Sequence, residues 1–371
     1  MIVSILVFIL VLSVLVLVHE LGHFIVARRA GIKVEEFGFG IPPRLIGKKF
    51  GETIYSINAL PFGGFVRLHG ENDEEGISDS KRAFLHKSKK ARALVVVAGV
   101  IMNFILAIVS FAIVYSFSGI PRDTGKLKII DVTAGSPAHV AGIVVGDIVT
   151  KVGKDPVNSS DSFISKTSAL KGIKTVFEIQ RLINGSESTV KISLTPRENP
   201  PAGEGPIGVT ITSMEIYFPP VWQRPFYGIY YGFKDALFWG QTIAVGLWGL
   251  LGGLFRGQVP QDVSGPVGIF AVTTEAAKSG IITLINFVGI LSVNLAILNI
   301  LPFPALDGGR LLFIGIEALT GRKVSPKVEG AIHNIGMIIL LTLLLAITIG
   351  DVRRLITFGG IQGFINSMVA K

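Results

Sequence analysis

The chain has 371 residues, of which 49% are hydrophobic and 16% are charged. Its mean hydropathy of +0.60 is too high for an ordinary soluble protein. These values indicate an integral membrane protein with an additional soluble portion, and the length allows roughly two or three units. There is no cysteine, which excludes disulfides and restricts any zinc site to histidine and carboxylate ligands. A chain without cysteine gives no information on the redox state of its compartment.

The formal net charge is +9, and the positive residues are unevenly distributed. Six of them crowd the stretch before the second apolar segment: Lys81, Arg82, Lys87, Lys89, Lys90 and Arg92. A basic run beside a span is typical of a cytoplasmic flank under the positive-inside rule. Nucleic-acid binding is the weaker explanation, because the run abuts a span and lacks interleaved aromatic residues. We expect a lipid bilayer and no nucleic acid as partner.

The first predicted transmembrane helix, residues 1–30, contains the motif H-E-x-x-H at His19, Glu20 and His23. Residues i and i+4 share a helix face, so two imidazoles can bind one metal ion while Glu20 acts as a base for metal-bound water. A soluble buried helix with satisfied histidines fits the long apolar run poorly, because ionisable groups in a span usually mark function. A cleaved signal peptide is disfavoured, since no small-x-small site precedes the motif.

A cytoplasmic loop is predicted over 31–92, with a membrane-associated β-loop at about 50–70. Thr53–Leu60 alternates weakly, and Pro61–Leu68 follows with a glycine-marked turn, which indicates a β-hairpin or β-loop against the membrane face. Two roles stay open. The segment is a plain connector, or its exposed strand edge pairs with an unwound substrate.

After a second span at 93–118, the pattern changes to short β-type runs over 119–215. Ser136–Ile143 and the following residues 146–152 resemble the helix, turn and strand of a PDZ domain. PDZ domains bind extended peptides or C-termini by strand addition, so a peptide ligand is one expected partner. The similarity concerns a fold and assigns no particular ligand.

The remainder of the chain divides into four predicted parts: a membrane-associated amphipathic segment at 216–280, a third span with a cytoplasmic loop at 281–330, a fourth span at 331–350 and a C-terminal tail at 351–371. Asp307 stands at the end of the third span, in the sequence Leu-Asp-Gly-Gly. It could supply the third protein ligand that a catalytic zinc commonly takes. The alternative is an ordinary turn or helix-terminal aspartate.

The chain resembles the site-2 protease family of intramembrane zinc metalloproteases (peptidase M50B), in its bacterial form. The resemblance rests on five elements in order along nearly the whole chain: His19 to His23, Pro61 to Phe65, the PDZ-like segment, Ser264 to Ile269 and Asn299 to Gly309. Three departures are one PDZ segment where some members have two, Val100 where many have proline, and Arg310 after the glycine pair.

The resemblance implies roles for five residues. His19, His23 and Asp307 would bind Zn²⁺. Glu20 would be the catalytic base, and Asn299 would help to hold the substrate. It also implies hydrolysis of peptide bonds within transmembrane segments of single-pass proteins, such as anti-sigma factors or remnant signal peptides. The alternative is an inactive, membrane-anchored PDZ scaffold. The physiological substrate and the oligomeric state are not predicted.

The orientation of the spans tests whether the H-E-x-x-H motif and Asp307 can lie at the same depth in the membrane. His19 lies about nine residues, or roughly 13 Å of helix, before Arg28, which places the metal in the inner half of the bilayer. Asp307 reaches that depth if the third span runs from outside to inside. The stretch 237–255 is also apolar, but an extra span there would reverse the direction of the third span, so we do not assign one. We therefore expect a polytopic α-helical membrane protein of the bacterial inner membrane, with four transmembrane helices, the β-loop and one mainly β PDZ domain. The PDZ domain and the N-terminus are expected to lie outside the cytoplasm.

Other polar residues receive weaker assignments. Asn103 in the second span either contributes to the site or makes an interhelical hydrogen bond. The remaining histidines are expected to be solvated or locally hydrogen-bonded rather than metal ligands, because none has a partner at ligand spacing: His69, His86, His139 and His333. The PDZ domain is expected to act either as a size filter or as a binder of new C-termini.

Overall fold

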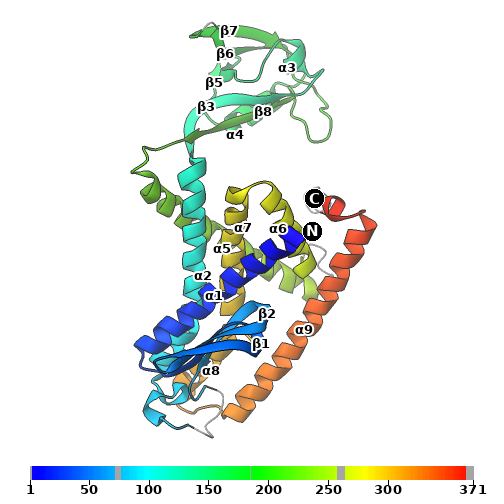
Figure 1. The fold of residues 1–371 in the computed structure, drawn as a ribbon. Coiled ribbons are helices and arrows are strands. Elements are labelled where there is room, and N and C mark those ends of the chain that lie inside the picture. The colour runs from blue at the N-terminus through cyan, green and yellow to red at the C-terminus, as the bar shows by residue number, and fades with distance from the viewer. Residues whose placement is uncertain (1, 72–76, 184, 257–263, 365–371) are drawn as a thin grey trace. The chain divides into compact units, whose positions relative to one another are not determined.

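The computed structural model describes residues 2–71, 77–183, 185–256 and 264–364. The chain forms two compact units: unit 1 comprises Met1–Ser118 and Pro220–Lys371, and unit 2 comprises Gly119–Pro219. Figure 1 shows the helices of unit 1 and the sheet of unit 2 along the chain. Unit 2 coincides closely with the segment 119–215 that the sequence analysis set apart.

Four described helices are long and apolar enough to cross a membrane: α1 (Ile2–Arg29), α2 (Lys89–Ser118), α7 (Ile281–Ile300) and α9 (Pro326–Thr357). This agrees with the predicted four transmembrane helices. The fourth helix is longer than the predicted span 331–350, because polar residues such as Glu329 and Asp351 continue the helix without adding hydropathy. The start of the predicted tail is thus helical, and residues 365–371 lie outside the described part.

Helix α2 packs against α1, α7 and two further helices, α5 (Arg224–Phe255) and α8 (Asp307–Thr320). A Cβ on Gly22 of α1 would lie 2.3 Å from the Ala98 carbonyl oxygen of α2, so only glycine permits this approach of the two backbones. On the other side, Phe111 of α2 packs with Val293 of α7 and Ala236 of α5 in one buried cluster. The central position of α2 brings its side chains next to the H-E-x-x-H helix.

A β-hairpin consisting of β1 (Val34–Phe50) and β2 (Thr53–Leu68) follows α1. Each strand is bent, and the register pairs four segments side by side in the order 44–50, 53–58, 34–39 and 64–68. The sequence analysis located β2 but not β1, whose glycines and the Pro42–Pro43 pair obscure its alternation. The turn lies at Gly51, not at the glycine pair after Pro61. Segment 64–68 forms one edge of this sheet.

The other helices of unit 1 lie before α2 and on either side of α7 in the sequence. Two 3-10 turns, Ser80–Arg82 and Phe84–His86, precede α2. The predicted amphipathic segment 216–280 contains α5 and α6 (Pro266–Lys278), with residues 257–263 outside the described part. Helix α8 occupies the predicted cytoplasmic loop and was not foreseen. Lys89 donates to the Glu317 carbonyl at 3.1 Å and Arg92 pairs with the Glu317 carboxylate, so part of the basic run anchors α8.

Unit 2 has eight elements: β3 (Ile120–Val132), α3 (Pro137–Val140), β4 (Ile148–Val152), β5 (Asp155–Pro156), α4 (Ser160–Ala169), β6 (Thr175–Ile183), β7 (Ser186–Leu194) and β8 (Val209–Tyr217). The strands are ordered β7-β6-β4-β3-β8, with β5 paired to β4, so β8 is an edge strand. Alternate residues of the central strands, including Leu127, Ile129, Phe177 and Ile179, bury a core. The expected helix and strands of this region are present. The PDZ assignment itself remains a proposal.

Candidate metal centre

Three side chains from two distant parts of unit 1 converge beside α2. His19 Nε2 and His23 Nε2 lie 3.1 Å apart, and Asp307 Oδ2 lies 3.0 Å from the first and 3.3 Å from the second. Among the described residues, this is the one group of His, Cys, Asp or Glu side chains with metal-binding geometry. Nearly three hundred residues of sequence separate the aspartate from the histidines.

The three donor atoms fit a zinc ion. Nitrogen and oxygen ligands about 2.0–2.2 Å from a tetrahedral zinc lie about 3.3 Å from one another, close to the separations between His19, His23 and Asp307. Asp307 Oδ2 is buried and has no hydrogen-bond donor within the described residues. Two imidazoles and one carboxylate form a donor set of catalytic zinc sites that leaves a fourth position free.

The second nitrogen of each imidazole fixes the orientation of its ring. His23 Nδ1 lies 2.8 Å from the Val95 carbonyl oxygen of α2, which can only accept, so the proton is on Nδ1 and Nε2 is free for a metal. The amide of Asn103, which is fully buried, lies 3.3 Å from His19 Nδ1, while its Oδ1 has no partner in the described part of the chain. Rotating this amide by 180° presents Oδ1 to a proton on His19 Nδ1.

Gly99 provides the space for both histidines. A Cβ at this position of α2 would lie 2.5 Å from His23 Nε2 and 2.8 Å from His19 Nε2. Any side chain would therefore collide with the two imidazole nitrogens that face Asp307. Gly99 and Asn103 are one helical turn apart, so α2 offers an open space and a hydrogen-bond partner on the same face.

Asp307 begins helix α8, after the turn that leaves α7. Cβ atoms on Gly308 and Gly309 would lie 2.0 Å from the Leu301 carbonyl oxygen and 2.5 Å from that of Phe303, so the glycine pair lets α8 start directly against this turn. Ala305 has a φ of 77°. This left-handed backbone costs a residue with a side chain about 1–2 kcal/mol, and other contacts must hold it.

The strand edge of the hairpin passes over the Glu20 face of α1. A Cβ on Gly64 would lie 3.7 Å from Glu20 Cγ, and Ser13 donates to the Pro61 carbonyl at 3.3 Å. Asn299, in the last turn of α7, has its side-chain nitrogen 3.5 Å from His19 Nε2. All five residues singled out by the sequence analysis thus occur in one region of unit 1. The sequence analysis gave Gly99 no role, and its i, i+4 spacing to Asn103 was the available signal.

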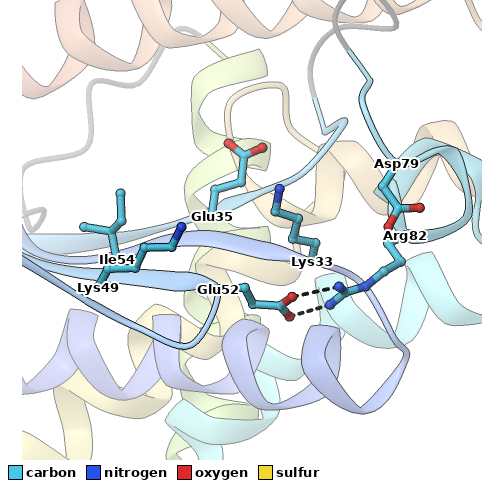
Figure 2. A pocket seen from close by; sticks show the side chains of 7 residues that line it. All are labelled: Lys33, Glu35, Lys49, Glu52, Ile54, Asp79 and Arg82. Carbon is cyan, nitrogen blue, oxygen red and sulfur yellow. Dashed lines mark hydrogen bonds and ion pairs between the residues drawn. The ribbon is translucent and has the colours of Figure 1, made fainter.

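Four other histidines lie outside the metal cluster. His69 donates to Glu35 at 2.7 Å, His86 lies 2.8 Å from Ser80 Oγ, and His139 and His333 accept from backbone amides. A separate hollow of about 440 Å³ is lined by Lys33, Glu35, Lys49, Glu52, Ile54, Asp79 and Arg82. Figure 2 shows Glu52 and Arg82 paired across it. The hollow contains no residue of the candidate metal centre.

Fold and site together define a polytopic membrane protein with a largely buried cluster of two histidines and one aspartate. The model of peptidase family M50 matches residues 7–343, and the chain belongs to this family. It is therefore a membrane zinc metalloprotease of the site-2 protease family, as the sequence resemblance implied.

Similar proteins cover almost the whole chain. A Clostridium acetobutylicum protein, provisionally named a zinc metalloprotease, is 37% identical over 96% of this chain and 99% of its own length. The zinc metalloprotease RasP of Geobacillus kaustophilus is 32% identical over 95% of this chain and 98% of its own. RasP of Oceanobacillus iheyensis is 30% identical over 94% and 98%, respectively.

Proposed function

We propose that this metalloprotease hydrolyses peptide bonds inside transmembrane segments of single-pass proteins, such as anti-sigma factors or remnant signal peptides. Asp307 at the start of α8 converges on His19 and His23, which lie in a helix long enough to span a bilayer, and this observation carries the proposal. The family membership and the complete set of chemical groups favour a protease over an inactive PDZ scaffold.

In the proposed mechanism, His19, His23 and Asp307 would hold the zinc ion, each through the atom that faces the other two. A zinc ion held there would supply Lewis acidity toward the scissile carbonyl and toward a water molecule. The Glu20 carboxylate accepts the proton of the attacking water and returns a proton to the departing amine as the C–N bond breaks. Val95 and Asn103 keep the imidazoles in the required tautomers.

A helical substrate must unwind before its peptide bonds can be attacked, and the freed backbone groups need partners at membrane depth. Within the described residues, segment 64–68 is paired along one side only, and its Gly64 lies next to Glu20, which supports substrate binding by strand addition. Asn299 has its amide next to His19 Nε2, within reach of a backbone group presented to the metal. These contacts favour the substrate-binding role of the hairpin over that of a connector.

The proposed orientation places the N-terminus and unit 2 outside the cytoplasm of a bacterial cell. It is supported by Arg28 and Arg29 at the end of α1 and by the basic run before α2. We further propose that unit 2 is a PDZ domain. Its edge strand β8 could bind a peptide C-terminus, or the whole domain could exclude substrates with large ectodomains.

Cleavage of a candidate transmembrane segment by the purified, zinc-loaded protein tests the proposal. Glu20→Gln should lose cleavage by a factor of about 10² or more but retain zinc, because Glu20 is not one of the three ligands. Glu187→Gln, at an exposed glutamate of unit 2, is the matched control and should cleave normally. Equal cleavage by Glu20→Gln and wild type would contradict the assignment, as would cleavage by neither across a broad substrate panel.

The two roles of unit 2 give opposite results when residues 119–219 are replaced by a short linker. A size filter predicts that the shortened protein cleaves substrates with intact ectodomains. A binder of new C-termini predicts that it loses cleavage of trimmed substrates. Zinc content of the shortened protein checks that unit 1 is still folded.

A further inference from the structure

Helix α9 contacts the turn between α7 and α8 through a hydrogen bond. Ala305 is the single non-glycine residue with a positive φ among the described residues, and it stands two positions before Asp307. Its backbone N–H donates to His333 Nδ1 of α9 at 2.9 Å. A strained residue two positions before a proposed metal ligand therefore donates its backbone hydrogen bond to a helix that contributes no proposed ligand.

Helix α9 fits this turn closely on both sides of the hydrogen bond. A Cβ on Gly336, nearly one turn after His333, would lie 2.3 Å from Pro304 Cβ. The imidazole of His333 also lies beside the ring of Phe313 in α8, with centroids 5.7 Å apart. In Figure 1, α9 is the long orange helix whose N-terminal end lies by α8. His333 thus contacts both the turn and the helix that carry Asp307.

We propose that His333 is a positioning residue for the zinc ligand Asp307. Its Nδ1 holds Ala305 in the left-handed conformation, and this sets the direction in which the chain enters α8 with the Asp307 carboxylate facing His19 and His23. The inference rests on the proposed zinc site and deepens it. It gives α9, which holds none of the proposed ligands, a role in keeping the metal.

The hydrogen-bond pattern defines what His333 must supply. Nδ1 accepts from a backbone amide, so it is unprotonated and the ring proton is on Nε2. Nε2 has no hydrogen-bond partner within the described residues, and Glu329 Oε1 is 3.9 Å away. The ring acts through its acceptor. Because the side-chain oxygen of asparagine can occupy the place of Nδ1, asparagine should replace His333, whereas leucine should not.

Zinc retention, measured by competition with a chelator in the purified full-length protein, tests the proposal without relying on cleavage. We expect His333→Leu to raise the zinc dissociation constant about tenfold, the usual effect of losing a residue that orients a ligand. His333→Asn should stay within about twofold of wild type. Asn334→Leu, at the exposed neighbouring position, is the matched control and should retain zinc normally.

A second substitution separates positioning from packing. Glycine adopts a positive φ without strain, so Ala305→Gly alone should be neutral and should restore most of the zinc affinity of His333→Leu. Unchanged affinity in His333→Leu overturns the inference, as does an equal loss in His333→Asn or a failure of Ala305→Gly to rescue. If the wild type and Asp307→Asn retain zinc equally, the proposed site itself fails.

Discussion

The two units differ in where their apolar side chains lie. Unit 2 buries a continuous apolar core, in which Phe177 and Ile179 are fully enclosed. In unit 1 many apolar side chains face outward, whereas polar ones are hidden between helices, among them Asn103, Ser292 and Asp351. Water drives apolar groups together, but lipid does not drive apolar helices together. Unit 1 therefore depends on small residues and on polar groups that satisfy one another.

The largest effect is expected at a small residue of unit 1. Gly99→Ala places a methyl group 2.5 Å from His23 Nε2 and should displace both imidazoles. We expect zinc content to fall at least about tenfold and cleavage to become undetectable. Gly330→Ala in α9, where a Cβ has open space, should change neither. Zinc analysis of the two purified variants compares them directly, and normal zinc in Gly99→Ala would refute the site geometry.

Unit 2 should respond to loss of apolar volume instead. Phe177→Ala removes a fully buried ring and should destabilise unit 2 by about 3–5 kcal/mol. Val176→Ala, on the opposite face of the same strand and 42% exposed, should cost much less. Hydrogen exchange of residues 119–219 in the intact protein measures both. Similar exchange in the two variants would break the contrast between the units.

A polar contact that joins two helices of unit 1 should be nearly as important as a core side chain. Asp351 Oδ2 of α9 accepts from the amides of Gly265 and Gly268 at 2.8 and 2.9 Å, at the start of α6. Asp351→Leu leaves two buried donors unpaired and should cost about 2 kcal/mol, or about 30-fold faster exchange of these amides. Asp351→Asn keeps an acceptor oxygen and should lose less. Slow exchange in the leucine variant would show that the contact is dispensable.

Variants of Asn103 test whether the proposed site needs the polar side chain of this residue or only its size. Asn103→Leu has the same branching at Cγ but no acceptor for His19 Nδ1, and we expect the zinc dissociation constant to rise about tenfold. Asn103→Asp keeps a carboxylate oxygen at the same place and should retain more of the affinity. Chelator competition distinguishes the two. Equal zinc affinity in both variants would assign Asn103 to the contact of its backbone with Ser292 instead.

The smallest effect is expected at a surface charge of unit 2. Lys151 and Lys191 hydrogen-bond to Glu178 and hold the pKa of its carboxyl below the usual range. A lowered folded-state pKa stabilises above the unfolded value of about 4.3, and this contribution disappears as pH falls through the folded-state pKa. Glu178→Gln should therefore slightly lower the melting temperature of unit 2 at pH 7 and lower it less at pH 3. A large change at pH 7 would contradict the contrast.

Features with a strong local signal could be predicted from the sequence. Hydropathy located four spans, and i, i+4 spacing located His19 and His23. Asp307 was proposed because a catalytic zinc site needs a third protein ligand, and the family resemblance and the direction of the third span supported it, since no local pattern links residues so far apart. Strand β1 was missed because prolines and glycines interrupt its alternation, and α8 was missed because a short helix after a span reads as loop.

Interhelical contacts were the least predictable part of the site. For Asn103, the sequence left two roles open, a contribution to the site and a structural hydrogen bond between helices. A polar residue in a span does not reveal which neighbour it bonds. Gly99 carries no chemistry of its own, and its importance follows only from the distance between α1 and α2. The acceptor role of His333 depends on the backbone conformation of Ala305, which the sequence around it does not reveal.

The division of the proposed site between α1 and α8 has a consequence for biosynthesis. The ribosome makes His19, Glu20 and His23 first, and Asp307 follows nearly three hundred residues later. At bacterial and eukaryotic elongation rates this interval lasts roughly 15 to 60 s. During that time the emerging chain holds only two of the three proposed zinc ligands. The order of synthesis would thus keep the proposed site incomplete until Asp307 has been added.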